Sequence, residues 1–326
     1  MLRTRLTEMF HLDYPIMSAP MTSHCGGKLA GAVAQAGGLG SFGGINGGGP
    51  DWVRQQIELI RAQTHRPFAV GFINHLIHQL PENFEMALSL RPPVVAFSFS
   101  NPQPWIGRAR ESGAVTMCQV QTLELAEEAV ASGAQILVAQ GNEAGGHTGL
   151  LNTLPFLVTL LDRFPEVPVL ASGGISSGRA LAAVLAAGAD GAWVGTAFVA
   201  TPEAVETPDR FKQQIIRSDG QDTAFTRLYD LLGDGPPWPE GIAGRVYRNG
   251  FVRRWDGRDE EIRRQREELA SDAAHGWEQQ DPELASVYLG QSAVNVKAIR
   301  PAAQVLRDIG DGAEELLRSR SRYLLG

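Results

Sequence analysis

The sequence predicts an α/β fold: a (β/α)8 barrel with a second, smaller and mostly helical domain. Between residue 14 and about residue 200, eight short apolar runs alternate with helical patterns. Parallel strands need helical crossovers, and eight strands close a barrel. The 326 residues leave room for one barrel of roughly 250 residues and an addition. An open doubly wound sheet would also give continuously apolar strands and is the alternative fold.

The expected elements follow in a regular order. Strands are predicted at residues 14–18, 39–42, 68–73, 94–98, 114–118, 136–139, 167–171 and 191–194. Helices between them are predicted at residues 28–36, 51–63, 123–132 and 150–164. A glycine run at 38–43 matches the dinucleotide-binding pattern GxGxxG. It follows a helix and does not open one, so we interpret it as a strand and its exit.

The pattern changes after the eighth predicted strand. Residues 233–241 are too rich in proline and glycine for a regular element, whereas the charged residues 253–280 predict a solvated helix. Two closing helices, at 293–306 and 313–325, are expected to return to the barrel. The predicted domains are a barrel made of residues 1–204 and 290–326, and a small helical lid or substrate domain made of residues 205–289.

Composition and charge limit the classes of partner. A formal charge of −7 argues against a nucleic acid or an anionic membrane as the main partner, since both select a basic face. Cys25 and Cys118 are too few for a disulfide framework or a cysteine-rich zinc site, and they predict reduced thiols in a cytoplasmic protein. The first ten residues mix charged and apolar side chains, unlike a signal peptide, and no apolar run approaches the ~18 residues needed to span a bilayer.

Two glycine-rich loops follow the seventh and eighth predicted strands, where a barrel of this kind holds a phosphate. They contain Ser172, Gly173 and Gly174, and then Gly195 and Thr196. Glycine lets the backbone approach a ligand closely, and the amides at a following helix start attract an anion. Each glycine alone could simply make a tight turn, but the two loops together predict a phosphorylated ligand.

Polar side chains follow several other predicted strands. Residues 18–21 follow the first strand, Asn74 the third, Gln119 the fifth and Gln140 the sixth. Convergent amides and backbone groups at strand ends suit a planar cofactor with apolar faces, such as the isoalloxazine ring of a flavin. For Asn74, a turn-forming role is an equal alternative.

Residues 140–149 place a carboxylate, Glu143, and an imidazole, His147, in a glycine-rich loop between a strand and a helix. An ordinary histidine pKa of about 6.5 suits proton removal from a carbon acid near neutrality, so His147 is a candidate general base. The alternative is a histidine that only hydrogen bonds to the loop backbone. The flanking glycines make a poor helix and no third ligand lies nearby, so we predict no metal site.

Six segments of the chain share a pattern with one known family. They are Pro15-Ile-Met-Ser-Ala-Pro-Met21, Ala34-Gln-Ala-Gly-Gly-Leu-Gly40, Pro67-Phe-Ala-Val-Gly-Phe-Ile-Asn74, Gln140-Gly-Asn-Glu-Ala-Gly-Gly-His147, Ala171-Ser-Gly-Gly-Ile175 and Val194-Gly-Thr-Ala-Phe198. The pattern resembles the nitronate monooxygenases, formerly called 2-nitropropane dioxygenases, over residues 3–203 and more loosely from Gly290 onward. This resemblance implies an FMN-binding TIM barrel with a small second domain. It also implies that His147 takes the α-proton of a nitroalkane or lies beside bound nitronate, while the flavin reacts with oxygen.

The resemblance also implies which residues contact FMN. Those near the isoalloxazine would be Ala19, Pro20, Met21, Asn74, Gln119, Gln140, Gly145 and Gly146. Those of the phosphate loops would be Ser172, Gly173, Gly174, Gly195 and Thr196. After the first strand this chain has Ser-Ala-Pro-Met where many members have Gly-Gly-Met. The proline-rich residues 233–241 and the arginine-rich helix also depart from the family pattern.

The function implied by the resemblance is an FMN-dependent oxidation of alkyl nitronates by O2. One alternative is an NAD(P)H-dependent flavin reductase of quinones or enoyl thioesters, because such enzymes of the same superfamily share the Glu-Ala-Gly-Gly-His core. A non-enzyme alternative is a barrel that binds a phosphorylated metabolite. The expected partners are a small-molecule substrate and O2, with NAD(P)H for the reductase. A homodimer is compatible with the sequence, which does not determine the oligomeric state.

Overall fold

The computed structural model describes residues 2–325; Met1 and Gly326, the outermost residues of the predicted barrel segments, lie outside it. Eight parallel strands form one sheet in the order β1-β9-β8-β6-β5-β4-β3-β2. They are β1 (Ile16–Ser18), β2 (Gly40–Gly43), β3 (Phe68–Ile73), β4 (Val94–Ser98), β5 (Val115–Val120), β6 (Ile136–Gln140), β8 (Val169–Ser172) and β9 (Gly191–Val194). The two end strands meet through a parallel bridge between Met17 and Leu39. The predicted barrel is therefore confirmed, and the open doubly wound sheet is not formed.

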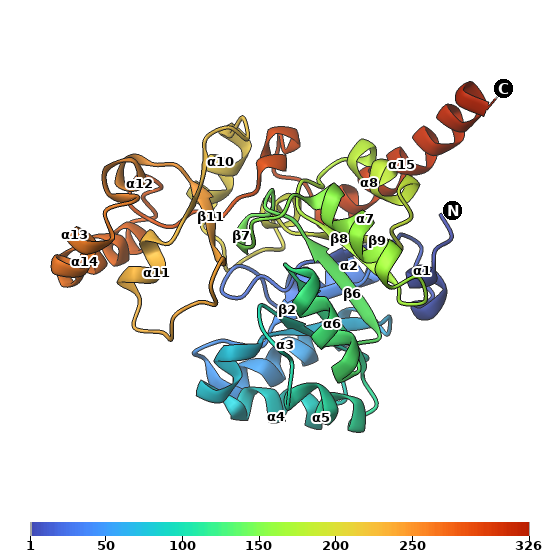
Figure 1. Cartoon of the computed structure of the whole chain (residues 1–326), viewed down its shortest axis with the longest axis horizontal. Helices are drawn as coiled ribbons and strands as arrows, with labels where there is room; N and C mark the ends of the chain where they lie inside the picture. The colour runs from blue at the N-terminus through green and yellow to red at the C-terminus, as the bar shows by residue number, and fades with distance from the viewer. Residues whose placement is uncertain (1, 326) are drawn as a thin grey trace.

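Helices connect the strands and cover the outside of the barrel (Figure 1). They are α2 (Gly27–Gln35), α3 (Gly49–Gln63), α4 (Pro81–Ser89), α5 (Trp105–Glu111), α6 (Leu123–Ser132), α7 (Thr153–Arg163), α8 (Gly178–Ala186) and the short α9 (Thr196–Val199). Helix α1 (Arg5–Phe10) precedes the first strand, and the 3-10 helix η1 (Asn74–Gln79) follows β3. The four helices predicted between strands are confirmed to within three residues at each end.

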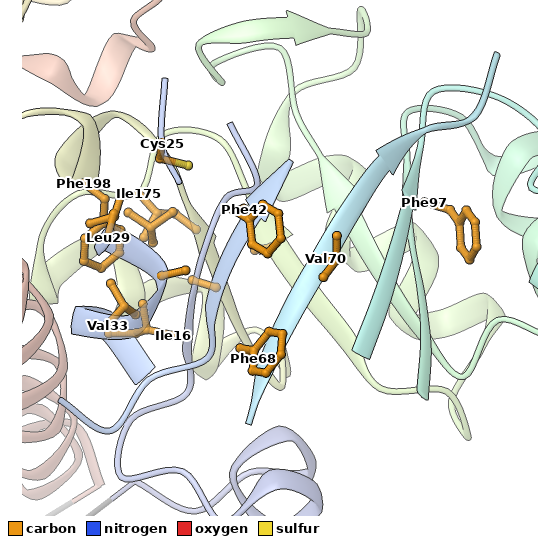
Figure 2. Close-up of a cluster of buried hydrophobic side chains, with 14 of the residues drawn as sticks. Ile16, Cys25, Leu29, Val33, Phe42, Phe68, Val70, Phe97, Ile175 and Phe198 are labelled. Atoms are coloured by element: carbon orange, nitrogen blue, oxygen red, sulfur yellow. The ribbon is translucent and has the colours of Figure 1, made fainter. Parts of the chain in front are cut away.

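Each barrel strand is buried on both faces, because the barrel interior and the helical layer both exclude water. In β6, Ile136 and Val138 belong to the interior cluster, whereas Leu137 and Ala139 belong to the cluster beneath the helices. Figure 2 shows part of this outer cluster, where Leu29 of α2 lies among other apolar side chains. The alternation explains why the strands have continuously apolar sequences.

A smaller segment follows the barrel strands and lies to one side of them, in the yellow and orange part of Figure 1. Its elements are α10 (Asp209–Arg217), β10 (Thr223–Thr226), α11 (Leu228–Leu232), β11 (Ala243–Tyr247), α12 (Gly250–Trp255), α13 (Asp259–Arg264) and α14 (Arg266–Glu278). Strands β10 and β11 were not predicted. They join β7 (Gly146–Thr148), which lies in the loop after β6, in a three-stranded antiparallel sheet.

The single helix predicted for residues 253–280 is wrong. The chain forms three helices there, because Gly257 adopts a φ of +79° between α12 and α13, and Gln265 ends α13. Trp255 and Ile262, on either side of the first break, both pack into the small core of this segment. The breaks let a charged stretch fold back on itself and bury its few apolar side chains.

The two closing helices predicted at 293–306 and 313–325 are also wrong, because one helix, α15 (Ala302–Leu325), replaces them. The glycines within α15 do not interrupt it, and they allow close packing. A Cβ on Gly310 would lie 2.1 Å from a ring atom of Tyr14, and one on Gly178 of α8 would lie 2.5 Å from the backbone of Gly312. Before α15, residues Gln291–Asn295 form the 3-10 helix η2. None of the helices between residues 2 and 325 has the length and apolar character needed to span a bilayer.

The contact between Gly40 and α2 gives a testable prediction. A Cβ on Gly40 would lie 1.8 Å from the carbonyl oxygen of Ala30, a backbone atom that cannot rotate away. Gly40→Ala should therefore lower the free energy of unfolding by about 1–3 kcal/mol, measured by urea denaturation. Gly107→Ala is the matched control, because its Cβ would meet no described atom within 4 Å and it lies within α5. Equal midpoints for the two variants would contradict the packing account.

Candidate functional site

The carboxyl ends of the barrel strands surround a cavity of about 410 Å³, the end at which barrel enzymes place their active sites. Its volume falls in the range of roughly 300–1,000 Å³ that small-molecule sites occupy. The predicted site residues on its wall are Ala19, Pro20, Met21, Gln119, Gln140, Gly145, Gly146, His147, Ser172, Gly173, Gly174, Gly195 and Thr196. The fold therefore brings these separate sequence segments to one cavity.

The phase of each strand decides which of its polar residues face the cavity. Gln119 is two residues beyond the interior residue Met117, and Gln140 is two beyond Val138, so both amides point inward. Asn74 does not line the cavity, in contrast to the prediction. Its Oδ1 accepts from the backbone N–H of Ser98 at 3.2 Å and its Nδ2 donates to the carbonyl of Ser100 at 2.5 Å. Its amide therefore holds the end of β4.

The first glycine loop after β8 follows a backbone path that favours glycine. Gly173 and Gly174 have φ values of +102° and +72°. A Cβ on Gly173 would lie 2.9 Å from the carbonyl oxygen of Gly141, so the two loops touch at the backbone. This path exposes the loop backbone to the cavity with no side chain in between.

The second glycine loop begins α9. Gly195 faces Met21, whose sulfur would lie 3.5 Å from a Cβ added to the glycine. The hydroxyl oxygen of Thr196 accepts from the backbone N–H of Gly290 at 3.0 Å. Because that bond uses only a lone pair, the hydroxyl proton of Thr196 can still be donated to a ligand.

The loop from 140 to 149 is held on the barrel side by its own polar groups. The carboxylate of Glu143 accepts from the backbone N–H and the hydroxyl of Thr153, at 2.9 and 2.6 Å, and thereby satisfies the start of α7. The amide of Gln140 donates to the carbonyl of His147 at 2.9 Å. The Glu143 carboxylate thus joins this loop to the start of α7.

The smaller segment holds the other side of the same loop. Strand β11 pairs with β7, which places Gly244 opposite His147 and Arg245 opposite Gly146. Nε of the buried Arg245 donates to the carbonyl of Asn142 at 2.7 Å. Burial lowers the pKa of Arg245, opposed by the nearby carboxylate of Glu143. These contacts attach the loop from 140 to 149 to a strand about one hundred residues later in the chain.

His147 is contacted on an edge and on a face by residues of the smaller segment. Its Nε2 lies 2.7 Å from Oδ1 of Asp230 on α11, and the two side chains are only 13% and 17% exposed. The ring of Trp238 stacks on the imidazole at a centroid distance of 3.5 Å and an angle of 9°. Trp238 comes from the proline- and glycine-rich stretch 233–241, which anchors itself in the cavity through this side chain.

Aromatic side chains form much of the remaining cavity wall. Phe99 meets the edge of Trp238 at 5.1 Å, and Tyr288 lies 5.8 Å from His147. Burial raises the pKa of Tyr288, which therefore stays neutral near pH 7. The lining residues missed by sequence reasoning include Gly71, Ser98, Phe99, Trp193, Trp238, Trp277 and Tyr288. A tryptophan within a proline–glycine stretch was the one local signal that could have pointed to Trp238.

The two cysteines are free and buried. Burial raises the pKa of Cys25 to about 12, so its thiolate is scarce near neutrality and Cys25 has no reactive form there. Among residues 2–325, there is no group of three or more His, Cys, Asp or Glu side chains arranged to hold a metal ion.

Comparison with known proteins identifies the family to which this chain belongs. The family model described as nitronate monooxygenase matches residues 3–312. The chain belongs to the nitronate monooxygenase family. Members of this family are flavin-dependent oxidoreductases that act on small molecules, and the chain is an oxidoreductase. Family membership favours the enzyme over the metabolite-binding barrel.

Individual relatives carry different names. A nitronate monooxygenase of Paraburkholderia phytofirmans is 30% identical over 267 residues, which cover 68% of this chain and 72% of that protein. A Mycobacterium tuberculosis protein is 32% identical over 253 residues, covering 77% of this chain and 68% of its own length. It is named (3aS,4S,5R,7aS)-5-hydroxy-7a-methyl-1-oxo-octahydro-1H-indene-4-carboxyl-CoA dehydrogenase. Among solved structures, FabK from Thermotoga maritima has a TM-score of 0.88 and 30% identity, and covers 99% of this chain and 100% of its own.

His24, on the cavity wall after β1, gives a prediction about acid stability. Burial lowers its pKa to about 4, below the value of about 6.5 expected in the unfolded chain. Between pH 6.5 and pH 4, the unfolded state therefore binds more protons than the folded state. The free energy of unfolding falls as the pH falls through this window. The free energy of unfolding of His24→Gln should fall by about 1.5 kcal/mol less than that of the wild type between pH 6.5 and 5, measured by denaturant unfolding at each pH.

The exposed His65 provides the control, since His65→Gln should keep the pH dependence of the wild type. If His24→Gln and the wild type lose stability in parallel, His24 is not held neutral by the fold.

Proposed function

We propose that this chain is an FMN-dependent oxidoreductase that oxidises alkyl nitronates, and the nitroalkanes from which they form, with O2. One observation supports this proposal most directly: the imidazole of His147 lies in the wall of the same cavity as both glycine loops. A candidate base and a candidate phosphate site thus face one space, as a flavin reaction on a carbon acid requires.

The cavity wall fits FMN in two respects. The loops at Gly173 and Gly195 present backbone where side chains would fill the space, and the hydroxyl of Thr196 is free to donate, which together suit a phosphate. Toward the barrel axis, Pro20 and Met21 provide apolar surface and Gln119 an amide for a flat heteroaromatic ring. FMN bound there would supply a two-electron acceptor that O2 can reoxidise.

In this proposal, each of these residues has a separate role. Gly145, Gly146 and Ser172 shape the wall beside the isoalloxazine, and Gln140 fixes the backbone that carries His147. His147 removes the α-proton of a neutral nitroalkane, and the electron pair of the broken C–H bond moves into the nitro group to give the nitronate. The aromatic wall around Trp238 keeps water from the reacting carbon.

The second candidate function is a flavin reductase or dehydrogenase that acts on a thioester, with NAD(P)H as the other substrate of the reductase. One comparison favours it: the relative from Mycobacterium tuberculosis is named for a carboxyl-CoA substrate. The same cavity would then receive the acyl end of a thioester, and His147 would face its carbonyl side. Nitronate oxidation is preferred because the family model and several relatives carry that name.

The free, buried cysteines support the inference of a reducing, cytoplasmic compartment for this enzyme. A homodimer and the use of NAD(P)H stay predictions from the sequence. The same holds for the division into a barrel and a lid or substrate domain at residues 205–289.

Flavin binding is the first test of the proposal. The purified protein should be yellow, and the apoprotein should recover flavin absorbance when FMN is added. Gly173→Val should bind FMN at least tenfold more weakly, because a branched side chain would enter the backbone cradle at a positive φ. Fluorescence titration with FMN measures this difference. A folded wild-type protein that takes up no flavin would overturn the cofactor assignment.

The second test concerns His147. His147→Asn should lower turnover of a neutral nitroalkane by ~10²–10⁴-fold while FMN stays bound, which is the range for loss of a positioned base. Oxygen consumption with a nitroalkane substrate measures the effect, and His65→Asn, an exposed change, should leave it unaltered. Equal turnover by His147→Asn and the wild type would remove His147 from this role.

A further inference from the structure

Asp230 forms the shortest polar contact that the structure gives to the His147 side chain. Oδ1 of Asp230 lies 2.7 Å from Nε2 of the imidazole. The other carboxylate oxygen, Oδ2, is buried and has no hydrogen-bond partner among the described residues. A buried carboxylate with one oxygen unsatisfied is costly, and a catalytic role is one of the explanations for such a group. The pair is therefore more than a surface contact.

We propose that Asp230 is a positioning residue that holds His147 with its proton on Nε2 and so leaves Nδ1 as the atom that accepts the substrate proton. This proposal rests on the proposed function, since it assumes that His147 acts as a base. It adds that the smaller segment, and not the barrel alone, completes the base.

The assignment of the two nitrogens follows from hydrogen-bond chemistry. An ionised carboxylate can only accept, so an imidazole nitrogen 2.7 Å from it must be the one that carries hydrogen. A neutral imidazole has one N–H and one lone pair, and the lone pair must then be on Nδ1. When Nδ1 takes the α-proton of a nitroalkane, the C–H electron pair enters the nitro group and the imidazolium stays beside the carboxylate of Asp230. No electron acceptor is involved in this step.

The fold fixes the geometry of the pair from both sides. His147 lies on β7, whose register is set by pairing with β11, and Asp230 lies on α11, between β10 and β11. The hydroxyl of Tyr229, the neighbour of Asp230 on α11, donates to the carbonyl of Leu284 at 3.0 Å and anchors the helix. The stacked ring of Trp238 prevents the imidazole from tilting out of the plane of the carboxylate contact. Rotation of His147 about χ2 would break both contacts.

The kinetic test compares two substrates of the flavin-loaded enzyme. A neutral nitroalkane needs a base, whereas a preformed nitronate has already lost its proton. Asp230→Asn should lower kcat on the nitroalkane by roughly 10-fold to 100-fold, less than the loss of the base itself, and should leave kcat on the nitronate within about twofold. A role in folding or in flavin binding would instead lower both activities. Asp234→Asn is the matched control. Asp234 lies just beyond the end of α11, and its side chain is 96% exposed.

A second readout does not depend on turnover. In the protein labelled with ¹⁵N-histidine, His147 should show a protonated Nε2 and an unprotonated Nδ1. Its Nε2 proton should appear as a downfield resonance that is lost in both Asp230→Ala and His147→Asn. Circular dichroism and flavin absorbance establish that the variants are folded. If Asp230→Asn does not fold, Asp230→Ala replaces it in the kinetic test.

The outcomes separate this inference from the proposed function. If His147→Asn impairs nitroalkane turnover and Asp230→Asn does not, the role of Asp230 is refuted while the base stands. Protonation of Nδ1 in the wild type would also refute the nitrogen assignment. If neither variant affects the nitroalkane reaction, His147 is not the base and Asp230 has no base to position. The proposed function itself fails only if the flavin-loaded enzyme also does not oxidise a preformed nitronate.

Discussion

The pairing of β7 with β11 is the interaction on which the candidate site depends. Strand β7 has only three residues and lies in a loop that is rich in glycine. A strand of this length is not stable alone, and its conformation comes from hydrogen bonds to β11, which in turn pairs with β10. The register places His147 opposite Gly244 and within reach of α11. Without this small sheet, the imidazole would have neither Asp230 on its edge nor Trp238 on its face.

Close backbone contacts reinforce that arrangement. A Cβ on Gly145 would lie 2.5 Å from the backbone nitrogen of Gly290, and the N–H of Gln291 donates to the carbonyl of Glu143 at 3.0 Å. The reactive loop is therefore enclosed between the barrel and the chain that returns to it. Glycine serves here as a packing residue, since two backbones meet where side chains would separate them. A loop that looks flexible in sequence is consequently held at several points.

The sequence predicted the features that depend on local patterns, and it failed where distant segments meet. The eight strands and the glycine loops follow from apolar runs and spacing over a few residues. The sequence could not show whether the side chain of Asn74 faces the cavity. Strands buried on both faces have no alternation of polar and apolar residues that would show which side chains point inward. Asp230 and Trp238 were missed because their contacts with His147 require the β7–β11 pairing across about one hundred residues. The close packing of Gly310 was likewise not predictable, because its partner, Tyr14, lies at the opposite end of the chain.

We propose above that this cavity holds a flavin that receives electrons from a nitronate. The most direct measurement is anaerobic rapid mixing of the FMN-loaded protein with an alkyl nitronate, and separately with NADH and NADPH, while flavin absorbance is followed. The nitronate should bleach the flavin, and neither NADH nor NADPH should do so on the same timescale. Rapid bleaching by NADH or NADPH, with no response to the nitronate, would contradict it and favour the thioester or quinone reductase.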